Sequence, residues 1–315
     1  MIIDAHAHIF SKIAGQRRME KTSSGRYGKV LVGNNVSQIL PPFLAHSCFD
    51  AEMLVYMMDN YGVDKAVLVQ NPVYGIINKE IAQAISVYPD RFIGTIQVDP
   101  LDKTAIETVK NIVTPTQSVL KFELSQDWGW SGIHPGIKID NPEFIGIWEL
   151  SAEMGLQVII DPGNIFNPGY QVEQIDKISN RYPNVKILLE HLGYLTTDLI
   201  NNDKALARRK ELIRLAQKDN VFLGFSATNI LVDDDYPCLH SLELLHEALL
   251  ITGVDKILWG SDIPSTLLKY TYRQMIDVIL KHAIFLTDNE KGKILGTNAL
   301  AFFNQFDTSK DHKSI

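Results

Sequence analysis

Cysteine and long apolar runs are both scarce in this sequence of 315 residues. Its two cysteines, Cys48 and Cys238, are too few and too far apart for a disulfide framework or a zinc motif. A chain of this length needs no disulfide, so we expect a reducing, cytoplasmic environment. No uncharged apolar run approaches the ~18–20 residues that span a bilayer, and the opening residues lack the features of a signal peptide. We therefore expect no membrane contact.

An excess of basic residues is also missing, since the formal net charge is −7. Without a basic stripe or a block of like charge, the sequence argues against a nucleic-acid surface or an interaction tail. Apolar residues make up 45% of the chain, which is enough for a large core. Chains of this length often divide into two domains, but a closed α/β barrel is a common exception.

Short apolar runs rich in β-branched residues recur along the chain, with helical patterns between them. The runs cover residues 2–3, 65–69, 92–98, 118–124, 156–160, 185–189, 221–225 and 256–259. Such nearly continuous hydrophobicity is typical of parallel strands that are buried on both faces. The alternation predicts βαβ units.

One predicted helix has clear signals for its start and its end. Asn141, Pro142 and Glu143 are typical of an N-cap, a first-turn proline and a first-turn acid, and Gly155 is placed to end the helix. Similar patterns cover residues 170–182 and 237–252. We therefore predict an α/β protein with a (β/α)8 barrel, and a doubly wound sheet is the main alternative.

A single domain is expected over residues 1–306, followed by a flexible tail at 307–315. Residues 11–47, which follow the first strand, are rich in glycine and poor in predicted strands. A long insertion at the carboxyl end of a barrel strand is a candidate lid over an active site. The alternative is a surface loop that only packs on the barrel.

Polar side chains follow nearly every predicted strand, where the chemistry of a barrel is located. They are His6, His8, Gln70, Asp99, Glu123, Asp161, His191, Ser226 and Asp262. His6 and His8 lie two apart, so both imidazoles point to one face of the strand and form half of a zinc-type site. Hydrogen-bonded packing of the two rings is the alternative.

Two further strand-end residues are candidates for catalysis. Asp262 could bind the metal and take a proton from an attacking water as general base, although an aspartate at this place could also cap a helix. His191 could bind metal, act on the substrate, or be a buried structural residue. Glu190 is expected to point away from the site, as an outer packing or salt-bridge group.

Several short motifs together resemble the amidohydrolase superfamily, in the branch related to aminocarboxymuconate-semialdehyde decarboxylase. Asp-Ala-His-Ala-His opens the chain at residue 4, and Tyr-Gly-Val-Asp-Lys-Ala-Val-Leu-Val begins at residue 61. Tyr-Pro-Asp-Arg-Phe-Ile-Gly, Val-Asp-Pro, Glu-His-Leu-Gly, Ile-Leu-Trp-Gly-Ser-Asp-Ile-Pro and Gly-Thr-Asn-Ala follow in that order. Each motif is short, but their order and spacing are specific.

The resemblance implies one divalent metal ion and no organic cofactor. In the family, the metal is held by the His-x-His pair, a fifth-strand histidine and the last-strand aspartate, while a sixth-strand histidine serves the chemistry. His6, His8 and Asp262 match as ligands, and His191 matches the catalytic histidine. The chain departs at Asp161, which stands where the family has a histidine. We predict Asp161 as the remaining ligand.

An aspartate ligand leaves the identity of the metal open. Zn²⁺ is the first expectation, but a hard oxygen ligand could favour Mn²⁺ or Mg²⁺. Alternatively, Asp161 binds nothing and the metal is weak or absent, as in some lactonases that resemble this branch. Lys121 and Glu123 lie on one face of the fourth strand, where a salt bridge between them would leave a mononuclear site.

The leading functional hypothesis is hydrolysis of a small ester, lactone or amide by a metal-activated water. An anionic substrate is favoured, because Arg17 and Arg18 of the candidate lid could bind a carboxylate, although they could equally belong to a solvated basic face with Lys21, Arg26 and Lys29. Trp130, with Trp128, could wall the pocket or pack in the core.

Two other hypotheses stay open. One is non-oxidative decarboxylation of an unsaturated or aromatic carboxylic acid, and the other is an inactive barrel that acts as a binding protein. Barrels of this kind often pair, so a homodimer is possible, and the small-molecule substrate is the only other partner that we expect.

Overall fold

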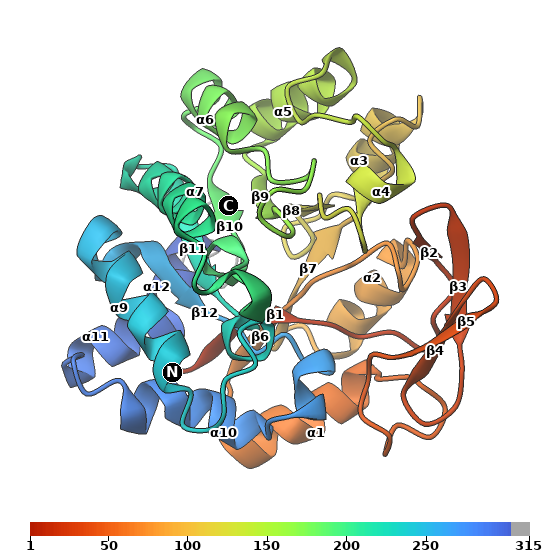
Figure 1. Cartoon of the computed structure of the whole chain (residues 1–315). Helices are drawn as coiled ribbons and strands as arrows, with labels where there is room; N and C mark the ends of the chain where they lie inside the picture. Colours follow the sequence, from red (N-terminus) through yellow and green to blue (C-terminus); the bar gives the residue numbers. More distant parts are fainter. Residues whose placement is uncertain (304–315) are drawn as a thin grey trace, which may run out of the picture.

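The computed structural model describes residues 1–303, and eight parallel strands close into a barrel (Figure 1). The strands, which pair in chain order, are β1 Ile3–Ala7, β6 Lys65–Leu68, β7 Phe92–Ile96, β8 Val119–Glu123, β9 Gln157–Asp161, β10 Ile187–Leu189, β11 Val221–Phe225 and β12 Ile257–Trp259. The first and last strands meet beyond β12, where the His8 amide donates to the Ile263 carbonyl at 2.9 Å. The predicted (β/α)8 barrel is confirmed, and the doubly wound sheet is excluded.

Helices lie between the strands in the chain and surround the barrel (Figure 1). They are α1 Ala51–Tyr61, α2 Asn78–Val87, α3 Ala105–Ile112, α4 Trp130–Ile133, α5 Pro142–Met154, α6 Val172–Arg181, α7 Asp203–Arg214, α8 Thr228–Leu231, α9 Leu239–Thr252, α10 Tyr272–Asp277, α11 Asp288–Gly292 and α12 Asn298–Phe302. Gly155 ends α5 in the left-handed conformation, with φ of 67°, as predicted. Asn141 stands at the N-cap position, but its side chain makes no capping hydrogen bond.

Apolar side chains form one layer between the strands and the helices and a second layer inside the barrel. The inner layer includes Phe302 and Phe303, both fully buried, from the end of the chain's described part. Lys186, just before β10, donates to the carbonyls of Ala301 and Phe302 at 2.7 and 3.4 Å. The amino-terminal end of the barrel is therefore closed by α12, and the carboxyl end is left for a site.

The insertion after β1 contains a small antiparallel sheet (Figure 1). Its strands are β2 Gln16–Arg17, β3 Glu20–Ser24, β4 Lys29–Val32 and β5 Asn35–Gln38. The expectation of a strand-poor segment was wrong. Its strands are short, but buried and exposed side chains alternate along them. Val30 and Val32 are buried, whereas Lys29 and Leu31 are exposed. The two-residue Gly-Asn turn at 33–34 joins β4 to β5 and is a hairpin signal.

This insertion packs on the loop that follows β6. The Gln16 amide donates to the Pro72 carbonyl at 2.9 Å, and the Thr22 hydroxyl donates to the Val73 carbonyl at 2.6 Å. One residue of the insertion, Ile39, reaches the cavity described below. These contacts place the insertion beside the carboxyl end of the barrel, and its movement as a lid stays a prediction.

No helix in residues 1–303 is both long and apolar enough to cross a membrane. The predicted tail at 307–315 lies outside the described residues.

Candidate active site

A cavity of about 210 Å³ opens at the carboxyl ends of the barrel strands. Six of the nine predicted strand-end residues line it, namely His6, His8, Glu123, Asp161, His191 and Asp262. The rest of the wall comes from Ile39, Asn71, Val73, Tyr74, Ser125, Trp128, Tyr194, Ala227, Ile230, Leu231 and Ser265. The structure thus brings together the polar strand ends that the sequence singled out.

The other three strand-end residues serve neighbouring structure. Gln70 is fully buried and bonds to side-chain and backbone atoms around β7. Asp99 pairs with His134, whose Nε2 lies 2.9 Å from both carboxylate oxygens. The Ser226 hydroxyl donates to Glu190 at 2.6 Å, so it contacts the site through another residue.

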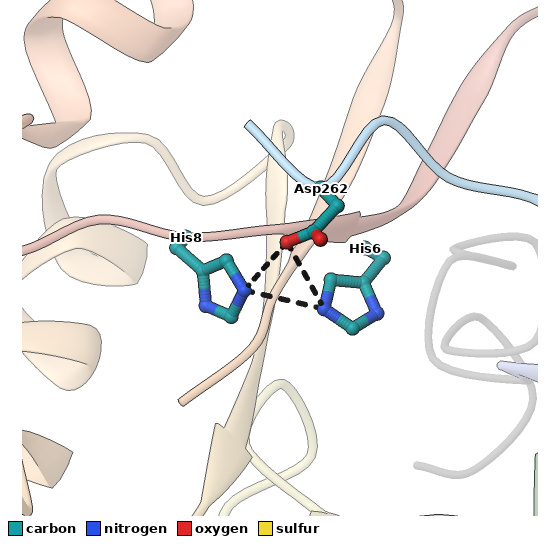
Figure 2. A group of neighbouring side chains, drawn as sticks. All are labelled: His6, His8 and Asp262. Atoms are coloured by element: carbon teal, nitrogen blue, oxygen red, sulfur yellow. Dashed lines mark hydrogen bonds and ion pairs between the residues drawn. The ribbon is translucent and has the colours of Figure 1, made fainter. Parts of the chain in front are cut away.

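His6, His8 and Asp262 form a compact cluster at the end of β1 and just beyond β12 (Figure 2). The two Nε2 atoms lie 3.2 Å apart, and Asp262 Oδ1 lies 3.0 Å from His8 Nε2 and 3.7 Å from His6 Nε2. These are ligand types that zinc and related divalent ions bind.

Polar contacts on the far side of each imidazole support this fit. His8 Nδ1 lies 2.7 Å from the Val69 carbonyl, which can only accept, so this nitrogen carries the proton. His6 Nδ1 lies 3.1 Å from Glu190 Oε1, which favours the same tautomer. Burial lowers the pKa of His8 more than Asp262 raises it, so the ring is held neutral. Three acceptor lone pairs therefore converge, and they suit a cation.

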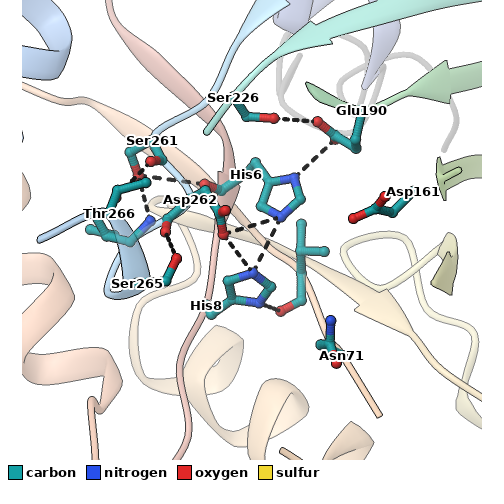
Figure 3. Close-up of polar contacts among 12 residues, drawn as sticks. His6, His8, Asn71, Asp161, Glu190, Ser226, Ser261, Asp262, Ser265 and Thr266 are labelled. Carbon is teal, nitrogen blue, oxygen red and sulfur yellow. Dashed lines mark hydrogen bonds and ion pairs between the residues drawn. The ribbon is translucent and has the colours of Figure 1, made fainter. Parts of the chain in front are cut away.

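Glu190 was expected to point away from the site, and this expectation was wrong. Its side chain is 1% exposed and lies inside the barrel between His6 and Ser226 (Figure 3). The strand β10 ends at Leu189, so the alternation of strand side chains no longer applies one residue later. Gly224 in β11 makes room, because a Cβ there would lie 2.2 Å from Glu190 Oε2.

Asp262 is positioned by a loop that is clamped to β1. Its amide donates to the His6 carbonyl at 2.7 Å, and its backbone is left-handed, with φ of 55°. Buried Asp4 accepts from both the amide and the hydroxyl of Ser261, the residue before. A Cβ on Gly260 would lie 2.6 Å from the His6 Cβ, so this close approach requires glycine.

The carboxyl group of Asp262, which is 16% exposed, lies against the imidazoles of His6 and His8. Burial raises its pKa, but the hydrogen bond from His8 and the charges of the surrounding imidazoles outweigh this effect, so the pKa lies below the usual range. Asp262 is therefore ionised at neutral pH and available as a ligand or as a proton acceptor.

His191 and Asp161 form a buried ion pair on the opposite wall. His191 Nε2 lies 2.9 Å from Asp161 Oδ2, and His191 Nδ1 lies 3.0 Å from the Ser226 carbonyl. Burial lowers the pKa of His191, but the Asp161 charge and hydrogen bond raise it to about 10. His191 is thus an imidazolium, and its φ of 60° begins a left-handed turn. Strained backbone of this kind is concentrated at functional sites.

Glu123, which lines the cavity, pairs with Lys121, which does not, and Oε2 and Nζ lie 3.5 Å apart. The predicted salt bridge is present, and both side chains are buried. Burial and the nearby Asp161 charge raise the pKa of Glu123 to about 8, against the opposing effect of Lys121. Glu123 also accepts from Asn71 at 3.2 Å.

Asp161 does not join the metal-ligand cluster in the structure. The candidate cluster in the described residues contains His6, His8 and Asp262, and Asp161 lies apart from it (Figure 3). Its two oxygens are engaged instead by His191 and by the Gly163 amide at 2.8 Å. The positive charge of His191 holds this carboxylate, so the predicted four-ligand set is not assembled, and ligation by Asp161 stays a prediction.

The predicted substrate-binding residues do not line the cavity, but one neighbour does. The Arg17 guanidinium stacks on the Trp128 ring at 3.8 Å, and Arg18 pairs with Asp127. Trp128 lines the cavity, whereas Trp130 is buried and stacks on His134. A substrate contact by Arg17, Arg18 or Trp130 stays a prediction.

Solved structures of low sequence identity share this fold. One is a probable 2-pyrone-4,6-dicarboxylic acid hydrolase from Acinetobacter baumannii with citric acid bound, 19% identical, with a TM-score of 0.71 over 96% of this chain and 99% of that one. A second is an amidohydrolase from Burkholderia multivorans with bound zinc, 18% identical, with a TM-score of 0.70 and the same coverage. A third is 5-carboxyvanillate decarboxylase from Sphingomonas paucimobilis, 19% identical, with a TM-score of 0.54 over 79% of this chain and 82% of that one.

No curated protein sequence matches the chain. A model of the family described as amidohydrolase matches residues 3–305, which is nearly the whole length. The matched region includes every residue of the cavity wall and of the histidine–aspartate cluster. The resemblance drawn from the short motifs is thereby confirmed, and the chain belongs to the amidohydrolase family.

Proposed function

We propose that this protein is a metal-dependent hydrolase that cleaves a small ester, lactone or amide. The observation that carries the proposal is the convergence of two imidazole nitrogens and one carboxylate in the cavity. His6 Nε2, His8 Nε2 and Asp262 Oδ1 would hold one divalent ion, with Zn²⁺ first and Mn²⁺ or Mg²⁺ as alternatives. Such an ion polarises a carbonyl and lowers the pKa of water toward neutrality.

The protein's own residues supply the proton transfer and the positive charge. Asp262 Oδ2, the oxygen that faces neither histidine, accepts a proton from the attacking water. At the same time, the oxygen of this water bonds to the carbonyl carbon. The carbon–oxygen or carbon–nitrogen bond then breaks, and the proton passes to the leaving atom. The His191 imidazolium lies at the cavity wall and stabilises negative charge on the carbonyl oxygen.

Two aspartates at strand ends provide a matched test of this mechanism. We expect Asp262→Asn to bind zinc more weakly and to lower lactone and ester hydrolysis by roughly 10²-fold or more. Asp99→Asn, whose carboxylate pairs with His134 outside the cavity wall, should change neither property. Elemental analysis measures the bound zinc. Initial rates with a panel of lactones, esters and amides measure hydrolysis.

Three other results of this panel would contradict the proposal in different ways. Full activity of metal-free protein in chelator would refute the role of the metal. Release of carbon dioxide from a carboxylic acid without water consumption would instead show decarboxylation, the reaction for which the third solved structure is named. Inertness toward both panels by metal-loaded protein would favour a binding role.

A further inference from the structure

Among the described residues, the cavity lacks the lysine or arginine side chain that would usually bind an anionic group of a substrate, and the one cationic side chain in its wall, His191, is already paired with Asp161. Three carboxyl groups line the cavity, from Glu123, Asp161 and Asp262. A substrate carboxylate that entered this space would lose its hydration and face the ionised carboxylates of Asp161 and Asp262, which is unfavourable without a paired cation.

The positive groups nearest to the cavity already have negative partners. The His191 imidazolium pairs with Asp161 at 2.9 Å, and Lys121 lies behind Glu123 at 3.5 Å. A divalent ion at the histidine cluster would be balanced by the carboxylates of Asp262 and of buried Glu190. The positive groups in and around the cavity are therefore engaged by the protein's own carboxyl groups.

The two arginines that suggested an anionic substrate are engaged elsewhere. Arg18 pairs with Asp127, and Arg17 donates to the Asp127 carbonyl at 3.3 Å while it stacks on Trp128. Trp128 itself is the residue of this group that lines the cavity. The ring of the tryptophan, and not a guanidinium, is therefore presented to a bound molecule.

The upper wall is apolar and is built by the loops that follow the strands. Its members are Ile39, Val73, Tyr74, Trp128, Ile230 and Leu231. The polar floor and this apolar collar together match a molecule with one reactive polar group and an apolar body. At about 210 Å³, the space is smaller than the ~300–1,000 Å³ of typical drug-sized pockets.

We infer that the substrate is a small, uncharged acyl compound with an apolar body, a neutral lactone or ester and not a carboxylate. This inference rests on the hydrolase function proposed above and departs from the anionic substrate that the sequence favoured. The uncharged substrate inferred here also differs from the dicarboxylic acid in the name of the first solved structure.

Two isosteric lactones test the inference directly. Dihydrocoumarin-6-carboxamide and dihydrocoumarin-6-carboxylate have the same number of heavy atoms and differ in charge. With zinc-loaded protein, we expect kcat/KM for the carboxamide to exceed that for the carboxylate by roughly tenfold or more. Equal or faster hydrolysis of the carboxylate would overturn the inference.

A cation placed on the apolar collar should weaken this preference. Leu231, half-buried at the end of α8, is a suitable position. We expect Leu231→Lys to lower the carboxamide-to-carboxylate ratio severalfold, and Leu231→Gln, of similar length but without charge, to leave it nearly unchanged. An unchanged ratio in a folded Leu231→Lys variant would show that the collar does not contact the substituent, and it would contradict the inference.

Binding separates this inference from the proposed function. The lactams that correspond to the two lactones resist hydrolysis, and their affinities for the zinc-loaded protein follow from calorimetry. If neither lactone is hydrolysed but the carboxamide lactam binds more tightly, the hydrolase proposal fails and the preference for uncharged ligands stands. Tighter binding of the carboxylate lactam, or no binding of either at millimolar concentration, would overturn the inference.

Discussion

Glu190 is the residue whose replacement tests the candidate metal centre most sharply, because it contacts a ligand and not the cavity. Its Oε1 lies 3.1 Å from His6 Nδ1, and both atoms are buried without another hydrogen-bond partner in residues 1–303. Glu190→Gln keeps the shape and the possible contact with Ser226 but removes the charge. We expect zinc affinity to fall, because the carboxylate raises the basicity of the His6 imidazole.

The size of the loss follows from the distance. A full positive charge on the imidazole at 3.1 Å would interact with the carboxylate by about 5 kcal/mol at an effective dielectric constant of about 20. A neutral ring offers only the partial charge of its N–H, so roughly a third of this value is a reasonable expectation. That corresponds to about 10–100-fold in the dissociation constant, the range usual for carboxylates behind metal-binding histidines.

Competition titration with a chromophoric chelator measures this affinity without a substrate. The melting temperature and circular dichroism of the metal-free variant check that the fold is retained. Glu143→Gln, an exposed glutamate in the first turn of α5, is the control and should bind zinc with unchanged affinity. An unchanged affinity in folded Glu190→Gln would refute the argument that Glu190 orients and polarises His6.

Three predictions concern packing and thiol reactivity. Gly260→Ala should destabilise the protein by about 1–3 kcal/mol, because its Cβ would lie 2.6 Å from that of His6, and urea unfolding measures this loss. Phe302→Ala should cost about 3–5 kcal/mol by the same measurement, since the ring is fully buried at the closed end of the barrel. Burial raises the pKa of the Cys238 thiol to about 11, so at pH 8 a thiol reagent should label half-exposed Cys48 alone, and both cysteines only after denaturation. Rapid native labelling of Cys238, or an undiminished unfolding free energy in either packing variant, would contradict these expectations.

The order and type of the barrel elements were predictable from the sequence. Buried parallel strands leave nearly continuous apolar runs, and helix ends carry local signals such as Pro142 and Gly155. The insertion was less predictable, because the strands β2 to β5 span only two to five residues each. Its alternating valines and Gly-Asn turn were nevertheless present as signals of a hairpin.

The site was predictable where strand geometry alone places a side chain. His6 lies near the end of β1 and His8 directly follows this strand, while Asp262 follows the strand that neighbours β1 in the closed barrel, so their convergence follows from the topology. The orientation of Glu190 was not predictable, because the strand ends one residue before it and a left-handed turn begins at His191. No local pattern signals that both side chains face the site.

By itself, the sequence determined the barrel, the paired histidines and the aspartate beyond the last strand. The spacing of apolar and polar residues is a local property, and the order of the strands in the barrel then fixes where each of these side chains lies. Apart from the Lys121–Glu123 pair, which the sequence predicted, tertiary structure alone decided which charges of the site pair. It placed Asp161 against His191 and outside the histidine cluster, Glu190 behind His6, and the arginines of the insertion on Asp127 and Trp128. The physical reason is that these partners come from separate strand ends and loops. Their distances depend on barrel closure and on side-chain packing, and these distances determine the charge of the cavity.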